Sequence, residues 1–78
     1  MPKKFTPEEQ LTIDRVGQRI RQLRNHLAIS QSELALRSDI PINQIGRIER
    51  GEINTTILTL ERIAKSLEVQ LFELFQST

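Results

Sequence analysis

The spacing of apolar residues constrains the fold of this chain more than any other feature, because it keeps the period of an α-helix throughout. Val16, Ile20, Leu23 and Leu27 follow one another at intervals of three or four positions, as residues on one helix face do. No segment alternates apolar and polar residues over the length that a half-buried strand requires. The pattern therefore predicts an all-α fold.

Capping residues and helix breakers mark where the first three helices begin and end. Thr6–Glu9 combines a cap, a proline in the first turn and two acids, so a helix should start here and run to about residue 25 or 27. Ser30–Glu33 has the sequence of a capping box and should begin a second helix. Pro41 ends the second helix and opens a third, which should stop before Gly51.

Two further helices are expected in the C-terminal part of the chain. Thr55 or Thr56 should cap a fourth helix, whose apolar residues share one face: Leu60, Ile63, Ala64 and Leu67. A short fifth helix should carry Leu71, Leu74 and Phe75. With 78 residues and short connections, these elements predict one domain over residues 1–78, built as a five-helix bundle.

Composition narrows the class of protein. The chain has no cysteine, so stability must come from helix packing, with self-association as a further source, rather than from disulfides or thiolate–metal sites. No apolar run reaches the roughly 20 residues that a membrane span needs. The charged residues of Met1–Phe5 are not followed by the apolar stretch of a signal peptide. We therefore expect a cytoplasmic protein.

Charge is distributed unevenly along the chain, although the formal net charge is only +1. Residues 1–50 contain nine Lys and Arg against six Asp and Glu, whereas residues 51–78 contain two against four. This asymmetry favours a protein with one side that faces a polyanion, and the alternative is an ordinary scatter of solvated charge.

The third predicted helix has two chemically different faces. One face is branched aliphatic and carries Ile42, Ile45 and Ile48, whereas the opposite face carries Asn43, Gly46, Arg47 and Arg50. A glycine inside a helix costs about 0.5–1 kcal/mol relative to alanine, so Gly46 reflects either close approach to another surface or mere tolerance. Asn pairs with adenine and Arg with guanine through two hydrogen bonds, so the polar face has the chemistry for reading base edges.

These segments resemble a known family. Gln31-Ser32-Glu33-Leu34-Ala35 through Gln44-Ile45-Gly46-Arg47-Ile48-Glu49-Arg50-Gly51 resembles the helix-turn-helix of the Cro/phage-repressor (Xre) family, and the similarity covers about residues 16–75. The number of correctly spaced matches, rather than any one tripeptide, makes the resemblance specific. It implies a bundle of five helices, with the motif at about residues 31–50 and its second helix, around residues 42–50, in the major groove of DNA.

The resemblance also implies roles for individual residues. The positions that read DNA bases in this family are here Ile42, Asn43, Gly46 and Arg47. The positions that contact the DNA backbone are Ser30, Gln31, Arg37 and Arg50. Arg24 and Glu49 match a pair that joins the first helix to the end of the third, which is a structural role. Asp39 stands where the turn usually has glycine, and Asp adopts left-handed geometry more readily than most residues.

Apolar residues in the C-terminal third indicate how the chain assembles. Leu58 and Phe72 are apolar where relatives are usually polar, so they are either singly exposed residues or part of a dimer interface. We favour a homodimer formed over about residues 56–76, with an interface of Leu58, Leu71, Phe72 and Phe75. For Phe72 the competing interpretation is packing in the core of the monomer. A two-fold dimer would bind a pseudo-palindromic site on double-stranded DNA.

These observations favour a sequence-specific transcriptional regulator, and the resemblance includes both phage repressors and restriction–modification controller proteins. The alternative is an antitoxin-type interaction module that also binds its own operator, although we expect no dedicated toxin-binding tail. An enzyme is disfavoured, because the single histidine, His26, lacks a cysteine or triad partner and no Gly-rich phosphate loop occurs. The sequence indicates no cofactor, no metal, no membrane and no small-molecule effector.

Overall fold

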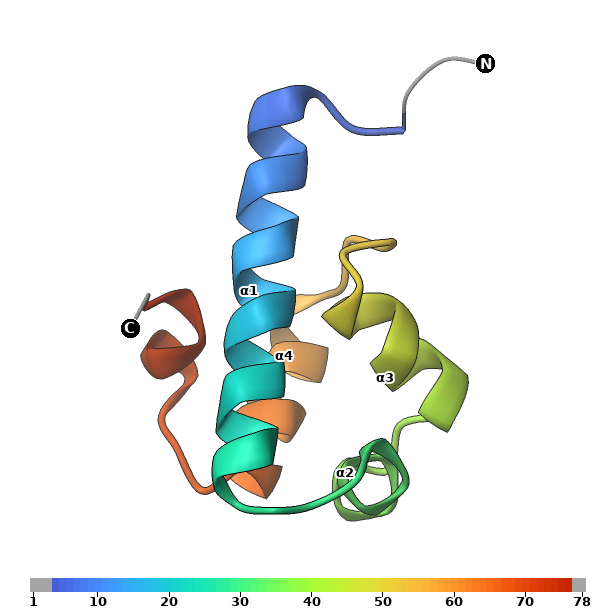
Figure 1. Ribbon diagram of the computed structural model, residues 1–78, viewed down its shortest axis with the longest axis vertical. Coiled ribbons are helices and arrows are strands. Elements are labelled where there is room, and N and C mark those ends of the chain that lie inside the picture. The colour runs from blue at the N-terminus through green and yellow to red at the C-terminus, as the bar shows by residue number, and fades with distance from the viewer. Residues whose placement is uncertain (1–3, 77–78) are drawn as a thin grey trace.

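The computed structural model describes residues 4–76, which form four α-helices and one 3-10 helix (Figure 1). The elements in chain order are α1 (Pro7–His26), α2 (Gln31–Ser38), α3 (Ile42–Glu49), α4 (Ile57–Ser66) and the 3-10 helix η1 (Leu71–Phe75). No strand occurs within residues 4–76, so the predicted all-α fold is confirmed. The predicted fifth α-helix is wrong, because the last element is a 3-10 helix. A segment of five residues that ends at the extended Gln76 is too short to build an α-helical ladder.

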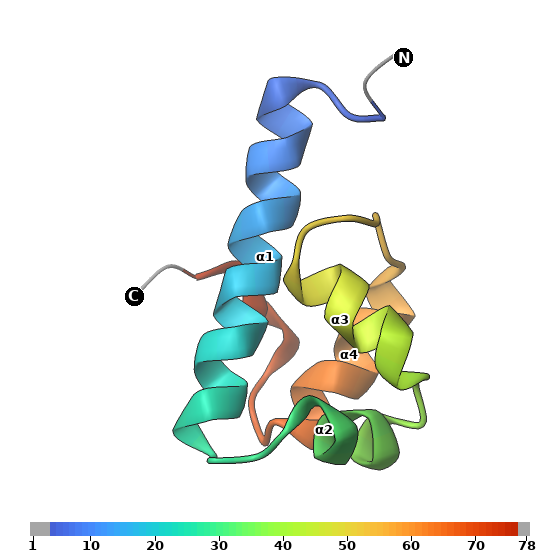
Figure 2. The same cartoon turned by 45° about the vertical axis from the view of Figure 1, so that its right-hand side comes forward.

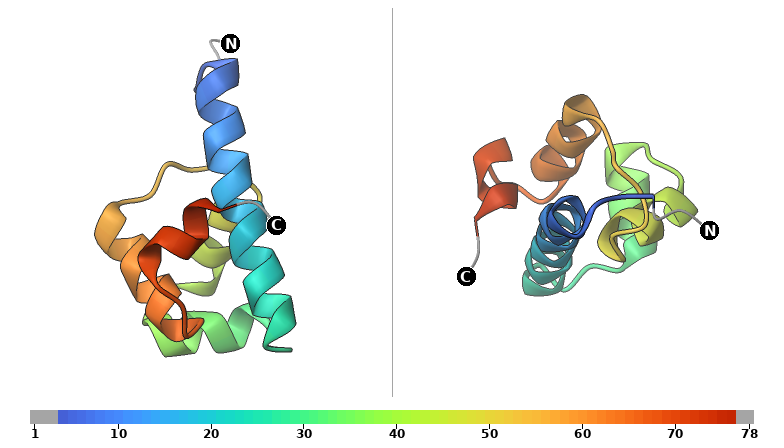
Figure 3. Two further views of the ribbon diagram at one scale, coloured as in Figure 1. Left: turned by 90° about the vertical axis from the view of Figure 1, so that its left-hand side faces the viewer. Right: turned by 90° about the horizontal axis from the view of Figure 1, so that it is seen from above.

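The long helix α1 forms the spine of the molecule. It contacts α3 on one side and η1 on the other, whereas α4 contacts both α2 and η1 (Figures 1 and 3). The N-terminal half of α1 projects beyond the rest of the bundle, which contributes to the elongated extents of 36 × 25 × 21 Å. This arrangement leaves α3 at the surface, and no other element crosses in front of it in Figure 2.

Every element contributes a fully buried side chain to one core. These side chains are Ile20 of α1, Leu34 of α2, Ile45 of α3, Ile63 of α4 and Leu74 of η1. Each stabilises the fold by about 1.5–3 kcal/mol relative to an exposed position. The four residues predicted to face inward on the fourth helix are all buried, which confirms that face.

The helix starts are fixed by side-chain caps. Thr6 and Glu9 form a reciprocal capping box at α1, and the Thr56 hydroxyl accepts a hydrogen bond from the Thr59 amide at α4. At α2 the predicted capping box is wrong in one half. The Ser30 hydroxyl accepts from the Glu33 amide at 3.0 Å, but the Glu33 carboxylate binds Arg37 one turn later instead of returning to the cap.

Left-handed residues end the helices. After α1, α3 and α4, the residues Ala28, Gly51 and Glu68 have φ of 57°, 71° and 63°. At α3 the Gly51 amide donates to the Ile48 carbonyl at 3.1 Å and the Glu52 amide donates to the Arg47 carbonyl at 2.9 Å. The same two bonds occur at α1 and α4, so all three helices end in a Schellman motif, although only one has the glycine that this motif usually carries.

Candidate DNA-binding interface

Helices α2 and α3 form a helix-turn-helix, joined by the three residues Asp39–Pro41. Asp39 has φ 57° and ψ 43°, so it adopts the left-handed conformation that this turn position requires. Ile40 is buried and its amide donates to the Ala35 carbonyl at 3.1 Å, which anchors the turn on the core. Pro41 precedes α3 and supplies no side-chain cap, so the first turn of α3 is left without a capping hydroxyl.

The two faces of α3 differ in exposure as well as in chemistry. Ile45 and Ile48 are buried against the bundle, whereas Asn43 and Arg47 are exposed. Ile42 is 49% exposed although it shares the aliphatic side of the helical wheel, because it lies in the first turn, beyond the core. Ile42, Asn43 and Arg47 are therefore accessible on a helix whose other side is fixed.

The exposure of Gly46 differs from the prediction. The helical wheel places Gly46 on the open polar face, but in the structure it is buried and other side chains of the protein cover it. A β-carbon at this position would lie 2.9 Å from Nη1 of Arg50 and 3.7 Å from Oε1 of Gln31. Gly46 therefore leaves space in which the Arg50 guanidinium lies along α3.

The residues expected at the DNA backbone already have partners within the protein. The Ser30 hydroxyl caps α2, and Gln31 donates from Nε2 to Oε1 of Glu49 at 3.0 Å. Nε of Arg37 lies 2.9 Å from Oε2 of Glu33. Nε of Arg50 lies 2.6 Å from Oε2 of Glu52, a partner that the sequence did not reveal. Both ion pairs remain at the surface, where water and other anions can reach them.

Glu49 is the centre of a buried polar network at the end of α3. Its side chain is fully buried and accepts from Nε and Nη2 of Arg24 at 2.7 and 3.0 Å. The expected structural pair is thus a two-pronged ion pair. Arg21 and Gln31 also donate to Oε1 of Glu49, at 3.4 and 3.0 Å, and Arg24 donates from Nη1 to the Ile29 carbonyl. The network joins α3 to α1 and to the first turn of α2.

Opposing effects act on the ionisation of this network. Burial alone would raise the pKa of Glu49, but hydrogen bonds from Arg24, Gln31 and Arg21, with the charge of Arg24, hold that pKa below its ordinary 4.5. The hydrogen bond to Glu49 raises the pKa of Arg24 in turn. These donors therefore favour the ionised form of the buried carboxylate.

The backbones of α1 and α3 meet at Gly17. A β-carbon on Gly17 would lie 2.5 Å from the Ile48 carbonyl oxygen and 2.7 Å from that of Glu49, closer than real β-carbons come. Only glycine allows this approach, and the only signal in the sequence is a glycine inside an otherwise regular amphipathic helix. The contact fixes the distance between α1 and the end of α3.

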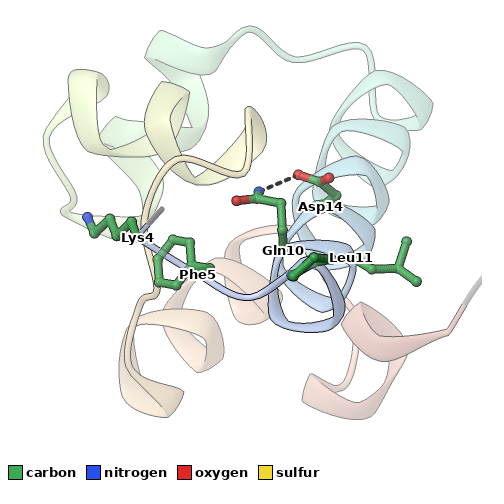
Figure 4. A pocket seen from close by; sticks show the side chains of 6 residues that line it. Lys4, Phe5, Gln10, Leu11 and Asp14 are labelled. Carbon is green, nitrogen blue, oxygen red and sulfur yellow. Dashed lines mark hydrogen bonds between the residues drawn. The ribbon is translucent and has the colours of Figure 1, made fainter. Parts of the chain in front are cut away.

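The N-terminal half of α1 holds Gly51, in the turn after α3. Gln10 donates from Nε2 to the Gly51 carbonyl at 2.7 Å and to Oδ1 of Asp14 at 2.9 Å, and Figure 4 shows its amide turned toward Asp14. A β-carbon on Gly51 would overlap the Asp14 carboxylate. The sequence does not reveal this contact, because Gln10 and Asp14 form no recognisable motif with a glycine some 40 residues away.

Two other kinds of site are absent from residues 4–76. None of the helices there combines the length and apolar character needed to cross a membrane. In the same part of the chain, no three His, Cys, Asp or Glu side chains come together as metal ligands would.

Comparison with known proteins agrees with this geometry. Residues 20–74 match the helix-turn-helix family HTH_3. The control protein C.BamHI of Bacillus amyloliquefaciens is 38% identical over 63 residues, which cover 80% of this chain and 78% of C.BamHI. The restriction-modification controller protein C.AhdI from Aeromonas hydrophila is 33% identical with a TM-score of 0.79, over 81% of this chain and 96% of C.AhdI.

A third comparison includes DNA. The restriction-modification controller protein C.Esp1396I, solved as a tetramer in complex with its natural 35 base-pair operator, has a TM-score of 0.76 and 34% identity. The similarity covers 82% of this chain and 88% of that one. The matched family, these relatives and the exposed face of α3 support one conclusion: the chain belongs to the HTH_3 helix-turn-helix family of DNA-binding transcriptional regulators.

Proposed function

We propose that this protein is a transcriptional regulator of the restriction–modification controller type, which binds operator DNA with α3 in the major groove. The observation that carries the proposal is the surface of α3, where Ile42, Asn43 and Arg47 are exposed while Ile45 and Ile48 fix the helix to the core. The relatives of this chain include controller proteins, one of which was solved with its operator.

Each exposed residue of α3 has a base edge that suits it. Arg47 can donate two hydrogen bonds to O6 and N7 of guanine, and Asn43 can pair with N6 and N7 of adenine. Ile42 can contact the methyl group of thymine. Gly46 has no side chain to offer, so its part is to let the α3 backbone and the covering Arg50 side chain come close to the groove.

Backbone contacts would come from the residues around this face. Ser30 and Gln31 lie at the start of α2, where free amides and the helix dipole favour a phosphate. Arg37 and Arg50 are exposed guanidinium groups that can exchange their carboxylate partners for phosphate oxygens. These contacts would orient the protein without reading sequence.

The dimer surface is proposed on α4 and η1, which lie side by side on a face away from α3 (Figure 3). Three large apolar side chains of these two elements are mostly exposed: Leu58 at 72%, Phe72 at 59% and Phe75 at 54%. Leu71 is half-buried against the core and would complete the patch. A two-fold dimer through this face would present two α3 helices about one turn of B-DNA apart, to a pseudo-palindromic operator.

Selection of bound duplexes from a random pool, followed by binding assays on Arg47→Ala, tests the proposal. Loss of a two-pronged base contact should weaken operator binding by about 1–3 kcal/mol and relax specificity at one base step. Arg37→Ala should weaken binding to every sequence alike and reduce the salt slope by about one unit.

Arg15→Ala is the matched control, because Arg15 is exposed and lies two positions from Gly17, on the side of α1 turned away from α3. It should leave operator binding nearly unchanged. Equal losses on operator and random DNA for Arg47→Ala would show that Arg47 contacts phosphate only, and failure to select any sequence would refute the proposed function.

A further inference from the structure

The turn that ends α3 places an acidic residue beside two arginines. Gly51 reverses the chain with φ 71°, and the Glu52 amide donates to the Arg47 carbonyl at 2.9 Å. Glu52 therefore lies at the carboxyl end of α3, where the negative end of the helix dipole disfavours a carboxylate. The helix dipole does not stabilise the charged carboxylate of Glu52, so its stabilisation comes from the two arginines.

Glu52 contacts both Arg47 and Arg50, the two arginines at the exposed side of α3. Nε of Arg50 lies 2.6 Å from Oε2 of Glu52, and Nη2 of Arg50 donates to Oε1 at 3.4 Å. Nε of Arg47 lies 3.9 Å from Oε1. The three side chains are 46–51% exposed, so DNA could reach all of them. The hydrogen bond from Arg50, with the charges of Arg50 and Arg47, holds the pKa of Glu52 below its ordinary value.

We propose that Glu52 is a built-in competitor of DNA, which holds the guanidinium groups of Arg47 and Arg50 in the free protein and must give them up when DNA binds. The inference rests on the proposed function, which assigns Arg47 to a base and Arg50 to the backbone. A phosphate offers the guanidinium the same anionic acceptor oxygens as a carboxylate does. Binding therefore exchanges one anion for another instead of capturing a free cation.

This exchange lowers affinity for all DNA. Binding to random sequence depends on neutralising phosphates, and an arginine that is already paired with Glu52 contributes less to that attraction. Arg47 must leave Glu52 to reach its base, whereas the base-edge contacts of Ile42 and Asn43 do not involve Glu52, so the operator is still distinguished from random sequence. The consequence is a weaker hold on the large excess of non-operator DNA, which allows the protein to leave wrong sites faster.

Glu52→Gln tests the inference, with Glu68→Gln as the matched control. Both changes remove one negative charge, but Glu68 is exposed and belongs to the connection between α4 and η1, a segment that lies on the other side of α1 from α3 (Figure 1). Binding is measured by fluorescence anisotropy on the selected operator and on a random duplex of equal length, over a salt series. Circular dichroism establishes that both variants keep the helical content of the original protein.

Glu52→Gln should bind both duplexes about 2- to 30-fold more tightly, the range expected for release from two exposed ion pairs. The slope of log K against log salt should steepen by about one unit. Glu52→Asp, which keeps the charge on a shorter side chain, should fall between the original protein and Glu52→Gln. Glu68→Gln should change both affinities by less than about 2-fold.

Equal behaviour of Glu52→Gln and Glu68→Gln would overturn the inference while leaving the proposed function intact. A gain on the operator alone would overturn it as well, because a competitor for guanidinium groups must act on every duplex. Absence of DNA binding by the original protein and by both variants would refute the proposed function and the inference together.

Discussion

The Arg24–Glu49 ion pair should hold the end of α3 on α1, and a double-mutant cycle on the free energy of unfolding measures how strongly. Glu49 is fully buried, and 13% of the Arg24 side chain is exposed. Arg24→Ala would leave a buried carboxylate with only Arg21 at 3.4 Å and Gln31 at 3.0 Å. Removing one partner of a buried pair costs about 3–5 kcal/mol. The two remaining donors should keep the loss near the lower end, at about 3 kcal/mol.

The coupling energy follows from the two hydrogen bonds that the pair makes, at 2.7 and 3.0 Å. A single hydrogen bond to a charged group contributes about 1.5–3 kcal/mol, so the cycle of Arg24→Ala and Glu49→Ala should give a coupling of at least about 1.5 kcal/mol. The Glu33–Arg37 pair is the internal control. Its distance is similar, at 2.9 Å, but its side chains are 39–42% exposed, so its coupling should be about 0.3–0.5 kcal/mol.

Urea denaturation followed by far-ultraviolet circular dichroism is the suitable assay, because the chain has no tryptophan or tyrosine to report by fluorescence. All variants should be compared at one low protein concentration, since self-association would add to the apparent stability. Arg24→Lys, which keeps the charge but loses the planar fork, provides a milder variant if Arg24→Ala is largely unfolded. A coupling for Arg24 and Glu49 no larger than that for Glu33 and Arg37 would refute the reasoning.

Three further predictions concern the helix contacts, the acid response and the assembly. Gly17→Ala should lower the free energy of unfolding by about 1–3 kcal/mol, because its β-carbon meets the backbone of α3. Gly46→Ala should raise the free energy of unfolding by about 0.5–1 kcal/mol, since only the flexible end of Arg50 must move. If urea denaturation gave the same change for Gly17→Ala and Gly46→Ala, both predictions would be contradicted. The pKa of Glu49 is lowered in the folded protein, so its stabilisation is complete above 4.5 and is lost as the pH falls through the folded pKa. Between pH 5 and pH 3 the free energy of unfolding should therefore fall more for the original protein than for Glu49→Gln. Equal falls in the two proteins over this range would argue against the prediction. Phe72→Asp should raise the dimer dissociation constant in analytical ultracentrifugation, because Phe72 is 59% exposed. At a protein concentration low enough for the monomer to dominate, helicity and Tm should be unchanged, and a fall in Tm under that condition would contradict the prediction.

The helix boundaries could be predicted from sequence because their causes are local. Thr6, Thr56 and Pro41 act on the residues next to them, and the structure places helix ends where these signals indicate. The type of the last element could not be predicted in this way. Leu71 and Leu74 are three positions apart, which suits a 3-10 turn as well as an α-helix, and only the shortness of the segment decides between them.

The site shows where local signals stop being sufficient. Gly17 and Gly46 look alike in sequence, as single glycines inside amphipathic helices. Gly17 is required by the backbone of another helix, whereas Gly46 only makes room for a neighbouring arginine. The expectation for Arg24 and Glu49 came from a family resemblance and not from their spacing of 25 residues. Glu52 was missed because its contacts depend on how the turn after α3 folds back.

The left-handed residues after α1 and α4 have a consequence for how the protein could adapt to heat. Ala28 and Glu68 adopt a backbone conformation in which a β-carbon is crowded. Gly51, at the corresponding place after α3, has no β-carbon and avoids this crowding. Exchange of Glu68 for glycine would relieve that crowding, in part at the expense of a more flexible unfolded chain. Glu68 lies outside the surface proposed to bind DNA. A change in thermal tolerance through Glu68 would therefore leave the exposed residues of α3 unaltered.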